Sequence, residues 1–512
     1  MNYIVKNIKI PVVQNPNIES ALKHILGNQI NLFQDIKVIR RALDTRKKDH
    51  PLYVYTLQAT AEKALKPHPD IVLLEETIEP VIPKVKLADA RPIIVGMGPA
   101  GLLCALAMVE QGLKPMLFDR GDKLTSRALA VENFWHNGKL DLQSNVQFGE
   151  GGAGAFSDGK LTSRAKSKYI QAVFDLLIKF GAPEHISWEA LPHLGTDGIR
   201  AVVSRIREFL ISQGCSFHYR SRLEDIVIEN EAVKKIVING QIYAPELLIL
   251  APGNAARDTF RMLANRGVAL QPKPFAIGFR ISHDQNWIDD KIYSSNSWTE
   301  LLGAASYRLT APKAGRGTYT FCMCPGGFVI AASSEAETNV TNGMSFAARD
   351  SGFANSAIVT VVDTDTYGTD LFDGMNLQAA IERQAFIKGY AAPFQTARDY
   401  LQNRLSAEQK VSCLFPASKS YQLSNLFPAQ INQALKQGLQ HFDQVLRGFI
   451  DQGILIAPET RTSSPLRMVR AEGNLNCLNI SNLYAVGEGS GYAGGIISSA
   501  ADGYRTGSRF AL

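Results

Sequence analysis

A glycine-rich segment, Gly-Met-Gly-Pro-Ala-Gly at 96–101, lies between an apolar strand pattern and a helix pattern. Residues 92–95 are predicted as the strand and residues 102–111 as the helix. Gly96 permits a tight turn, Gly98 lets a phosphate approach the backbone, and Gly101 lets the helix pack closely on the strand. Free N–H groups and the helix dipole would then face a phosphate.

The surrounding residues supply the context that a dinucleotide site requires. Residues 117–119 are predicted as a second strand, which completes a βαβ unit with two parallel strands. Asp119 lies about 20 positions after the first glycine, where a carboxylate accepts ribose hydroxyls. Arg120 is interpreted either as a cofactor contact or as a solvated charge. Pro99 and Ala100 suit the first helical turn, where the missing proline N–H costs nothing.

A second glycine-rich stretch occupies residues 148–160. Its glycines prevent a regular element and favour a loop against a phosphate or a planar ligand. Phe148 and Phe156 argue against a free surface loop, which is the alternative. The residues expected to contact the ligand here are Gly151, Gly152, Gly154, Ser157, Gly159 and Lys160.

Two further apolar strands, 247–250 and 483–486, each run into a small-residue turn. Glu488 is placed to bind a polyol hydroxyl, and the following helix N-terminus is placed to stabilise negative charge on a reduced ring. Glycine-rich junctions near both ends of one sheet domain suit a long dinucleotide. The residues expected at these junctions are Ala251, Gly253, Gly487, Glu488, Gly494, Gly495 and Ile496.

The length of 512 residues predicts two or three domains, because single cores rarely exceed about 250–300 residues. The expected fold class is α/β, with a Rossmann-type domain, an inserted α+β substrate domain and a small N-terminal α+β domain. In the N-terminal domain we expect strands at 3–12, 35–42 and 52–59, a helix at 18–26, and a linker at 77–89. The expected domains are 1–87 (N-terminal), 88–258 and 456–512 (dinucleotide-binding), and 259–455 (substrate).

The net charge of +6 permits anionic ligands without demanding nucleic acid. A basic cluster at 40–48 is interpreted as a solvated face, with RNA binding as the alternative. Six scattered cysteines argue against a disulfide framework and fit a reducing cytoplasm. No apolar run reaches the ~18 residues of a membrane span, and no metal site or particular oligomeric state is predicted.

The candidate catalytic residues lie in the middle of the chain and near its end. Cys322 and Cys324 are expected on one face of a strand, about 6.5–7 Å apart, at the edge of disulfide reach. The alternative for this pair is a small-residue turn that lines a pocket. Arg280 is a polar residue in an apolar block, and Arg461 is interpreted as an anion clamp or an interdomain salt bridge. His283 is interpreted as a proton donor or as a hydrogen-bonded structural residue.

These blocks together resemble the glutathione-reductase-like FAD-binding fold, with a substrate domain inserted into the FAD domain. More narrowly, the chain resembles the bacterial FAD-dependent (NAD(FAD)-utilizing) dehydrogenase family over nearly its whole length. The supporting segments are 40–46, 148–164, 273–280, 321–327, 341–345, 459–467 and 487–496.

The resemblance implies non-covalent FAD. It would place the pyrophosphate at the 96–101 glycines, the adenosine ribose at Asp119, the ribityl chain at Glu488, and the flavin ring near residues 494–496. Glu488 departs from the commoner Asp of the wider superfamily. The leading hypothesis is an FAD-dependent oxidoreductase acting on a small molecule, with NAD(P)H as a transient donor. The alternatives are a flavoprotein that binds or modifies RNA through its N-terminal domain, and a non-catalytic flavoprotein.

Overall fold

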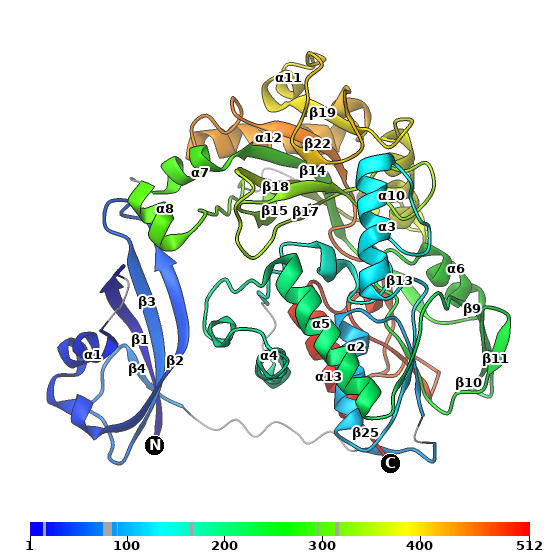
Figure 1. The fold of residues 1–512 in the computed structure, drawn as a ribbon, viewed down its shortest axis with the longest axis horizontal. Helices are drawn as coiled ribbons and strands as arrows, with labels where there is room; N and C mark the ends of the chain where they lie inside the picture. The colour runs from blue at the N-terminus through cyan, green and yellow to red at the C-terminus, as the bar shows by residue number, and fades with distance from the viewer. Residues whose placement is uncertain (14–16, 75–83, 90, 164–166, 294–295, 313–316) are drawn as a thin grey trace.

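The computed structural model describes residues 1–13, 17–74, 84–89, 91–163, 167–293, 296–312 and 317–512. The chain is mixed α/β with several sheets, which confirms the coarse fold class. Figure 1 shows the N-terminal sheet on one side of the remainder of the chain. Much of the predicted linker, and Arg164 at the end of the segment 148–164, lie outside the described residues.

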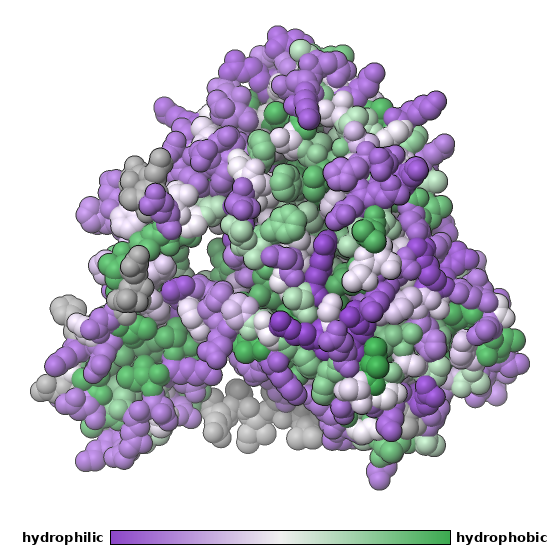
Figure 2. Space-filling view, viewed as in Figure 1, coloured by the Kyte–Doolittle hydropathy of each residue, from purple (hydrophilic) through white to green (hydrophobic). Residues whose placement is uncertain are grey.

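The N-terminal residues form an antiparallel sheet in the order β2-β3-β1-β4. Its elements are β1 (Asn2–Pro11), α1 (Ile18–Leu26), β2 (Phe33–Asp44), β3 (Leu52–Ala61) and β4 (Ile71–Leu73). The predicted strands and helix are confirmed here within a few residues. Leu22 and Leu26 of α1 pack against Val5, Ile8 and Leu57 of the sheet, as a single apolar stripe requires. Figure 2 shows that hydrophobic residues also gather on the outside of this domain.

The N-terminal domain joins the rest of the chain through the main chain of Arg41. The Arg41 N–H donates to the Trp188 carbonyl at 2.7 Å, and the Ala190 N–H donates to the Arg41 carbonyl at 2.8 Å. The Arg41 guanidinium pairs with Glu189 and lies over the rings of Tyr53 and Trp188. One residue of the basic cluster is therefore part of an internal contact.

A five-stranded parallel sheet lies next, in the order β24-β12-β6-β7-β8. Its strands are β6 (Ile93–Val95), β7 (Met116–Phe118), β8 (Ser216–His218), β12 (Leu248–Leu250) and β24 (Leu483–Ala485). All four pairings are parallel. The predicted strands that carry the glycine junctions are thus neighbours in one sheet.

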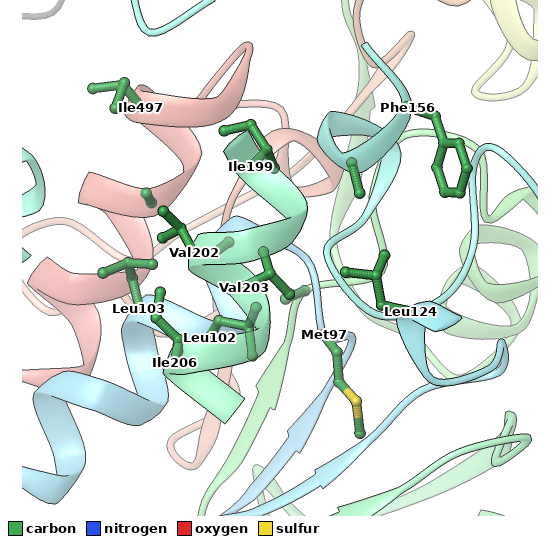
Figure 3. Packing of buried hydrophobic residues seen from close by; sticks show 14 of the residues in the cluster. Met97, Leu102, Leu103, Leu124, Phe156, Ile199, Val202, Val203, Ile206 and Ile497 are labelled. Atoms are coloured by element: carbon green, nitrogen blue, oxygen red, sulfur yellow. The ribbon is translucent and has the colours of Figure 1, made fainter. Parts of the chain in front are cut away.

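Both faces of this sheet are buried. On one face, Ile94, Leu117 and Ile249 pack against α2 (Pro99–Val109), α4 (Lys168–Lys179), α5 (Gly195–Ser212) and α13 (Ile496–Gly507). Figure 3 shows side chains of α2, α5 and α13 meeting in this cluster. On the other face, alternate strand residues pack against the sheet of β9 (Leu223–Glu229), β10 (Ala232–Ile238) and β11 (Gln241–Tyr243). Burial on both faces explains why these strands are continuously apolar.

A larger sheet has the order β15-β18-β14-β22-β19-β21. Its strands are β14 (Phe275–Asp284), β15 (Thr318–Cys324), β18 (Phe353–Val362), β19 (Ala392–Thr396), β21 (Ser418–Ser420) and β22 (Ile454–Glu459). Helix α12 (Ala429–Val445) packs on it through Ile431, Leu435 and Leu439. Figure 1 shows this sheet lying against the end of the parallel-sheet region where α3 (Leu124–Asn137) stands.

The chain enters and leaves the larger sheet at one place, because β13 (Leu270–Pro272) and β23 (Leu466–Met468) pair antiparallel. Part of the predicted linker instead forms β5 (Val85–Lys86), which pairs with β25 (Phe510–Ala511). The other elements are β16 (Phe328–Ala331), β17 (Thr341–Met344), β20 (Cys413–Leu414), α6 (Arg257–Asn265), α7 (Gln285–Ile292), α8 (Asn296–Leu302), α9 (Thr364–Tyr367), α10 (Asp373–Gln384) and α11 (Ala397–Leu401).

Candidate functional site

The glycine junctions meet at the carboxyl edge of the parallel sheet. Strand β6 runs into Gly96, β12 into Ala251, and β24 into Gly487. A Cβ on Gly96, whose φ is 108°, would overlap the Ala251 carbonyl, and a Cβ on Gly487 would lie 2.6 Å from the Ala100 Cβ. Strand order reverses between β6 and β12, and ligands of open parallel sheets bind at such a switch point.

The second glycine-rich stretch folds over the first. The Gly151 N–H donates to the Met97 carbonyl at 2.8 Å. A Cβ on Gly152 would lie 3.1 Å from the Gly98 Cα, and a Cβ on Gly154 would lie 3.0 Å from Ile496. This loop therefore spans the starts of α2 and α13, two helices that are far apart in the sequence.

Two glycines of the site are not required by the protein's own packing. A Cβ on Gly98 would lie 3.7 Å from its nearest neighbour, and a Cβ on Gly494 would meet nothing within 4 Å. Neither residue has a positive φ. By contrast, a Cβ on Gly101 would overlap the Gly96 carbonyl. Gly98 and Gly494 thus leave room for a ligand that lies close to the backbone.

The two helices that begin at the site lack side-chain caps. Gly98 is the N-cap of α2 and Gly495 the N-cap of α13, and neither can accept a hydrogen bond through a side chain. The first N–H groups of each helix, together with its dipole, therefore favour an anion. A pyrophosphate suits α2, which Pro99 begins as predicted.

Asp119 ties the second strand to the glycine turn. Its carboxylate accepts hydrogen bonds from the Met97 and Gly121 N–H groups, each at 2.8 Å. A carboxylate has further acceptor positions, so a ribose hydroxyl fits beside these bonds. Arg120 pairs with Asp258 and lies over the Phe148 ring, so it is held in place rather than freely solvated.

Arg127 is an important residue that the sequence analysis did not single out. It is fully buried in α3 and donates five hydrogen bonds to backbone carbonyls, those of Asn145, Val146, Gly149, Glu150 and Gly152. Its guanidinium lies 4.6 Å from the Phe156 ring, and Arg200 lies 4.2 Å from the same ring. Arg127 thus fixes the shape of the second glycine-rich loop, although no sequence pattern marks it.

Glu150, inside that loop, has a structural role. Its buried carboxylate accepts from the Leu124 N–H at 2.8 Å, from Arg207 at 2.9 Å, and from Tyr219 at 3.2 Å. The contact with Leu124 caps the start of α3, where an acid is favoured. Glu150 therefore connects the loop to α3 and α5.

Glu488 lies where β24 ends. It accepts a hydrogen bond from the Asn254 side chain at 3.0 Å. Burial raises the pKa of Glu488 to about 7, although the Gly495 N–H and the Lys273 charge favour the ionised form. The pair Asn254 and Glu488 offers donor and acceptor atoms to a polyol beside the start of α13.

Asp158 and Lys160 follow the second glycine-rich loop. The fully buried Asp158 accepts from Ser345 at 2.5 Å and from Arg349 at 2.9 Å, and Lys160 lies 3.7 Å away. Ser345 and Arg349 come from the segment after β17. The loop is therefore bonded to residues of the middle region, which closes one side of the site.

The structure brings Cys322, Cys324 and Arg280 together. The Arg280 Nη2 donates to the Cys322 carbonyl at 2.7 Å and lies 3.7 Å from the Cys324 Sγ. Strand β15 contains both cysteines, as expected, but it is not regular at this point. The β15–β18 register shifts between Phe321 and Cys324, which places a β-bulge at the pair.

Arg461 forms the salt bridge that was one of its two interpretations. Its guanidinium binds Glu382 at 2.8 and 3.0 Å and Ser334 at 2.6 Å, and Arg257 binds the same carboxylate. Burial disfavours the charge on Glu382, yet Arg461 and Arg257 lower its pKa to about 2. A role as an anion clamp would require Arg461 to leave this buried network.

His283 is held among aromatic rings. It stacks on Trp287 and lies 4.5 Å from Phe449, whose carbonyl is 2.8 Å from Nε2. Burial lowers the pKa of His283 to about 4, so the imidazole is neutral. This arrangement matches the hydrogen-bonded structural interpretation.

Comparison with known proteins identifies the family. An uncharacterized protein of Clostridium beijerinckii is 39% identical over 520 residues, which cover 98% of this chain and 97% of that protein. The chain belongs to the same family. Residues 274–462 match the family described as FAD-dependent protein, C-terminal domain-like. This match, over the middle part of the chain, supports FAD as the predicted cofactor.

Solved structures show a more distant likeness to this chain. CtdE in complex with FAD is 11% identical with a TM-score of 0.32, covering 82% of this chain and 83% of its own. The Escherichia coli quinol fumarate reductase FrdA is 11% identical with a TM-score of 0.36, covering 83% and 70%. An oxidoreductase of Methanosarcina mazei is 12% identical with a TM-score of 0.34, covering 81% and 99%.

The described residues lack two features that mark other classes of protein. Among these residues, no helix has the length and apolar character that a membrane crossing needs. The same residues contain no group of three or more His, Cys, Asp or Glu side chains placed to bind a metal ion.

Proposed function

We propose that this chain is an FAD-dependent oxidoreductase that transfers a hydride between non-covalently bound flavin and a small-molecule substrate. The observation that carries the proposal is the convergence of the glycine junctions at the switch point of the parallel sheet. Gly98 adds support, because its missing side chain is explained by a ligand and not by the protein's own packing.

Each part of FAD has residues of matching chemistry. The start of α2 and Gly98 would hold the pyrophosphate, and Asp119 would hold the adenosine ribose. Asn254 and Glu488 would bind the ribityl chain, and the start of α13 would lie at the flavin ring. Bound FAD would supply a two-electron acceptor or donor. In this proposal residues 88–258 and 456–512 bind FAD, and residues 259–455 position the substrate.

The chain's own residues would set the protonation and shape of this site. Glu488, with its pKa raised to about 7, holds a proton over part of the neutral range and can hydrogen-bond either as donor or acceptor. Arg127 and Glu150 keep the glycine-rich loop in place over the start of α2. Asp158 and Arg349 hold that loop to the middle region. The spacing G-x-G-x-x-G occurs at 96–101, 149–154 and 489–494, and 96–101 is the one of these that directly links a strand to the helix of a βαβ unit. A nicotinamide dinucleotide is therefore proposed as a transient electron donor that has no separate folded domain of its own.

An absorbance spectrum of the purified protein tests the proposal directly. Oxidised flavin bands that bleach on anaerobic addition of NADH or NADPH are the expected result, and they name the donor. Bands that persist with both nucleotides, and with every reduced substrate offered, would favour the non-catalytic flavoprotein. A colourless protein that cannot be reconstituted with FAD would contradict the proposal.

The RNA alternative is not favoured by the contacts of the basic cluster. Arg41 is engaged with Glu189 and Trp188, and Arg46 pairs with Asp44. RNA binding by the N-terminal domain stays an untested prediction. Salt-sensitive tRNA binding that disappears in a variant lacking the charges of Arg40, Lys47 and Lys48 would support it.

A further inference from the structure

Cys322 occupies a strained position in a β-bulge. Phe321 pairs with Ala357 and Cys324 pairs with Asn355, so two residues of β15 oppose the single residue Ser356 of β18. The φ of Cys322 is 45°, in the left-handed region. Bulges with a left-handed first residue usually have glycine there. A reactive side chain that keeps such a conformation is a mark of a functional position, because bulges near active sites redirect side chains.

The Arg280 side chain contacts both cysteines. Its Nη2 donates to the Cys322 carbonyl at 2.7 Å and lies 3.7 Å from the Cys324 Sγ, while the Cys324 thiol donates to the same carbonyl at 3.3 Å. Arg280 is fixed in turn by Glu459 at 2.9 Å and by Asn355 at 2.8 Å. A Cβ on Gly343 would overlap the guanidinium, so β17 leaves space for it. The pair is therefore pre-arranged within a rigid, buried frame.

The cysteine pair lies near residues that follow the second glycine-rich loop. The charges of Lys160 and Asp158, which follow the second glycine-rich loop, both act on Cys322, and Cys322 in turn acts on Glu488 after β24. Cys322 is half-buried and Cys324 is fully buried. A Cβ on Gly327 would lie 3.1 Å from the Cys324 Cβ and 3.0 Å from the Ser345 Cβ, and Ser345 donates to Asp158 at 2.5 Å. The cysteine pair is therefore close to the residues that follow the second glycine-rich loop.

The two thiols differ from the other four cysteines of the chain. A hydrogen bond between the two side chains lowers the pKa of Cys322 below its ordinary value, against burial and with help from the charges of Lys160 and Arg280. The pKa of Cys324 is raised by the same contact and by burial. Burial raises the pKa values of the remaining cysteines, Cys104, Cys215, Cys413 and Cys477. A thiolate beside a thiol is the state from which a disulfide forms.

We propose that Cys322 and Cys324 form a redox-active dithiol–disulfide pair that exchanges an electron pair with FAD. In the oxidative direction the Cys322 thiolate and the Cys324 thiol form one Sγ–Sγ bond and the Cys324 S–H bond breaks. Two electrons and that proton pass to oxidised FAD, which becomes the reduced anion, so charge and hydrogen balance. The reverse reaction returns both to the thiolate and the thiol. The inference rests on the proposed flavin site.

The test uses anaerobic reductive titration of the FAD-loaded full chain with dithionite. The wild-type protein, first oxidised in air, should take up two electron pairs per chain, one for FAD and one for the disulfide. The Cys322→Ser and Cys324→Ser variants should each take up one pair, and the matched control Cys413→Ser should take up two. Titration end points are read from the flavin absorbance.

A second measurement reads the thiols without the flavin. The air-oxidised wild-type chain is denatured in the presence of iodoacetamide, which alkylates free thiols. The mass of the peptide that contains both cysteines is then measured by mass spectrometry. We expect no alkylation of either residue before reduction and alkylation of both after it. If a serine variant fails to fold, this measurement on the wild-type chain still decides.

The outcomes separate the two proposals. A chain that binds FAD, takes up one electron pair and is alkylated at both cysteines in the oxidised form would contradict the disulfide and leave the flavin proposal intact. A chain that binds no FAD would contradict both. Two electron pairs in the wild type that fall to one in both serine variants would establish the exchange.

Discussion

The Nη1 atom of Arg127 donates a 2.6 Å hydrogen bond to the backbone carbonyl of Glu150, inside the loop that covers the candidate flavin site. A charged side chain is thereby buried against main-chain oxygens instead of against a carboxylate. Burial lowers the pKa of Arg127 to about 9, and the nearby Asp119 charge opposes this. One residue of α3 thus makes a large contribution to the shape of the loop.

Replacement of Arg127 by methionine should destabilise the loop and abolish most FAD binding. Five carbonyls would lose their donor, and a buried acceptor left unpaired costs about 1–3 kcal/mol. We expect the free energy of unfolding to fall by about 3 kcal/mol or more. Urea denaturation and flavin content measure this. Arg205→Met, which removes one bond to the Phe180 carbonyl, is the matched control and should retain FAD.

Two glycines of the first motif should have different roles, Gly98 in FAD binding and Gly101 in the packing of the protein. Gly98→Ala should leave the free energy of unfolding of the FAD-free protein within about 0.5 kcal/mol and weaken FAD binding about tenfold or more, because the new methyl lies at an ordinary contact distance of 3.7 Å from the Gly152 Cα but would overlap the ligand. Gly101→Ala should cost about 2 kcal/mol of stability, because its methyl overlaps the Gly96 carbonyl. Isothermal titration with FAD and denaturation of both variants provide the comparison. Equal FAD affinity in Gly98→Ala and wild type would contradict the pyrophosphate assignment.

Glu488 should make the stability of the FAD-free protein depend on pH. Its folded-state pKa, about 7, exceeds the value of about 4.3 in an unfolded chain, so the folded state retains the proton over this interval. The free energy of unfolding should therefore fall as pH rises from about 4.3 to about 7, by about 1–2 kcal/mol after allowance for partial exposure. Subtracting the Glu488→Gln curve from the wild-type curve, both measured by urea denaturation, isolates this group. A difference curve that is flat would show that Glu488 keeps an ordinary pKa.

The Arg41 contact should govern how firmly the N-terminal domain is held. Arg41→Ala removes the pair with Glu189 and the stacking on Tyr53 and Trp188, for a loss of about 1–2 kcal/mol of local stability. Hydrogen exchange at residues 187–190 should accelerate correspondingly. Arg46→Ala removes an exposed pair with Asp44 and should change exchange little. Equal exchange rates in both variants would show that the main-chain bonds of Arg41 suffice.

The local pattern of the sequence was sufficient to place the glycine motifs on strands and helices. Alternation of apolar strand and small-residue turn predicted β6, β12 and β24, and the proline at position 99 predicted the start of α2. These features are short-range, because a tight turn or a first helical turn depends on a few adjacent residues. The same local reasoning could not order the strands in the sheet.

The residues that sequence reasoning missed act through long-range contacts. Arg127 and Glu150 are bonded to loops and helices that fold back over them, and neither lies in a recognisable spacing with its partners. Conversely, the sequence allowed Arg461 to be interpreted as an anion clamp, but in the folded chain its guanidinium binds Glu382 of a distant helix. The β-bulge at Cys322 was also invisible, because a regular strand and a bulged strand share the same apolar alternation.

The sequence by itself determined which segments form the glycine turns and the strands that lead into them, because backbone conformation at glycine and proline is set by local sterics. Only the tertiary structure decided that residues 96, 151, 251 and 487 meet at one edge of a sheet, that Arg280 contacts both cysteines, and that the cysteine pair lies near the residues that follow the second glycine-rich loop. Those relationships depend on strand order and on buried ion pairs between distant segments. A buried ion pair is stable only where its contacts in the folded chain offset the cost of removing both charges from water.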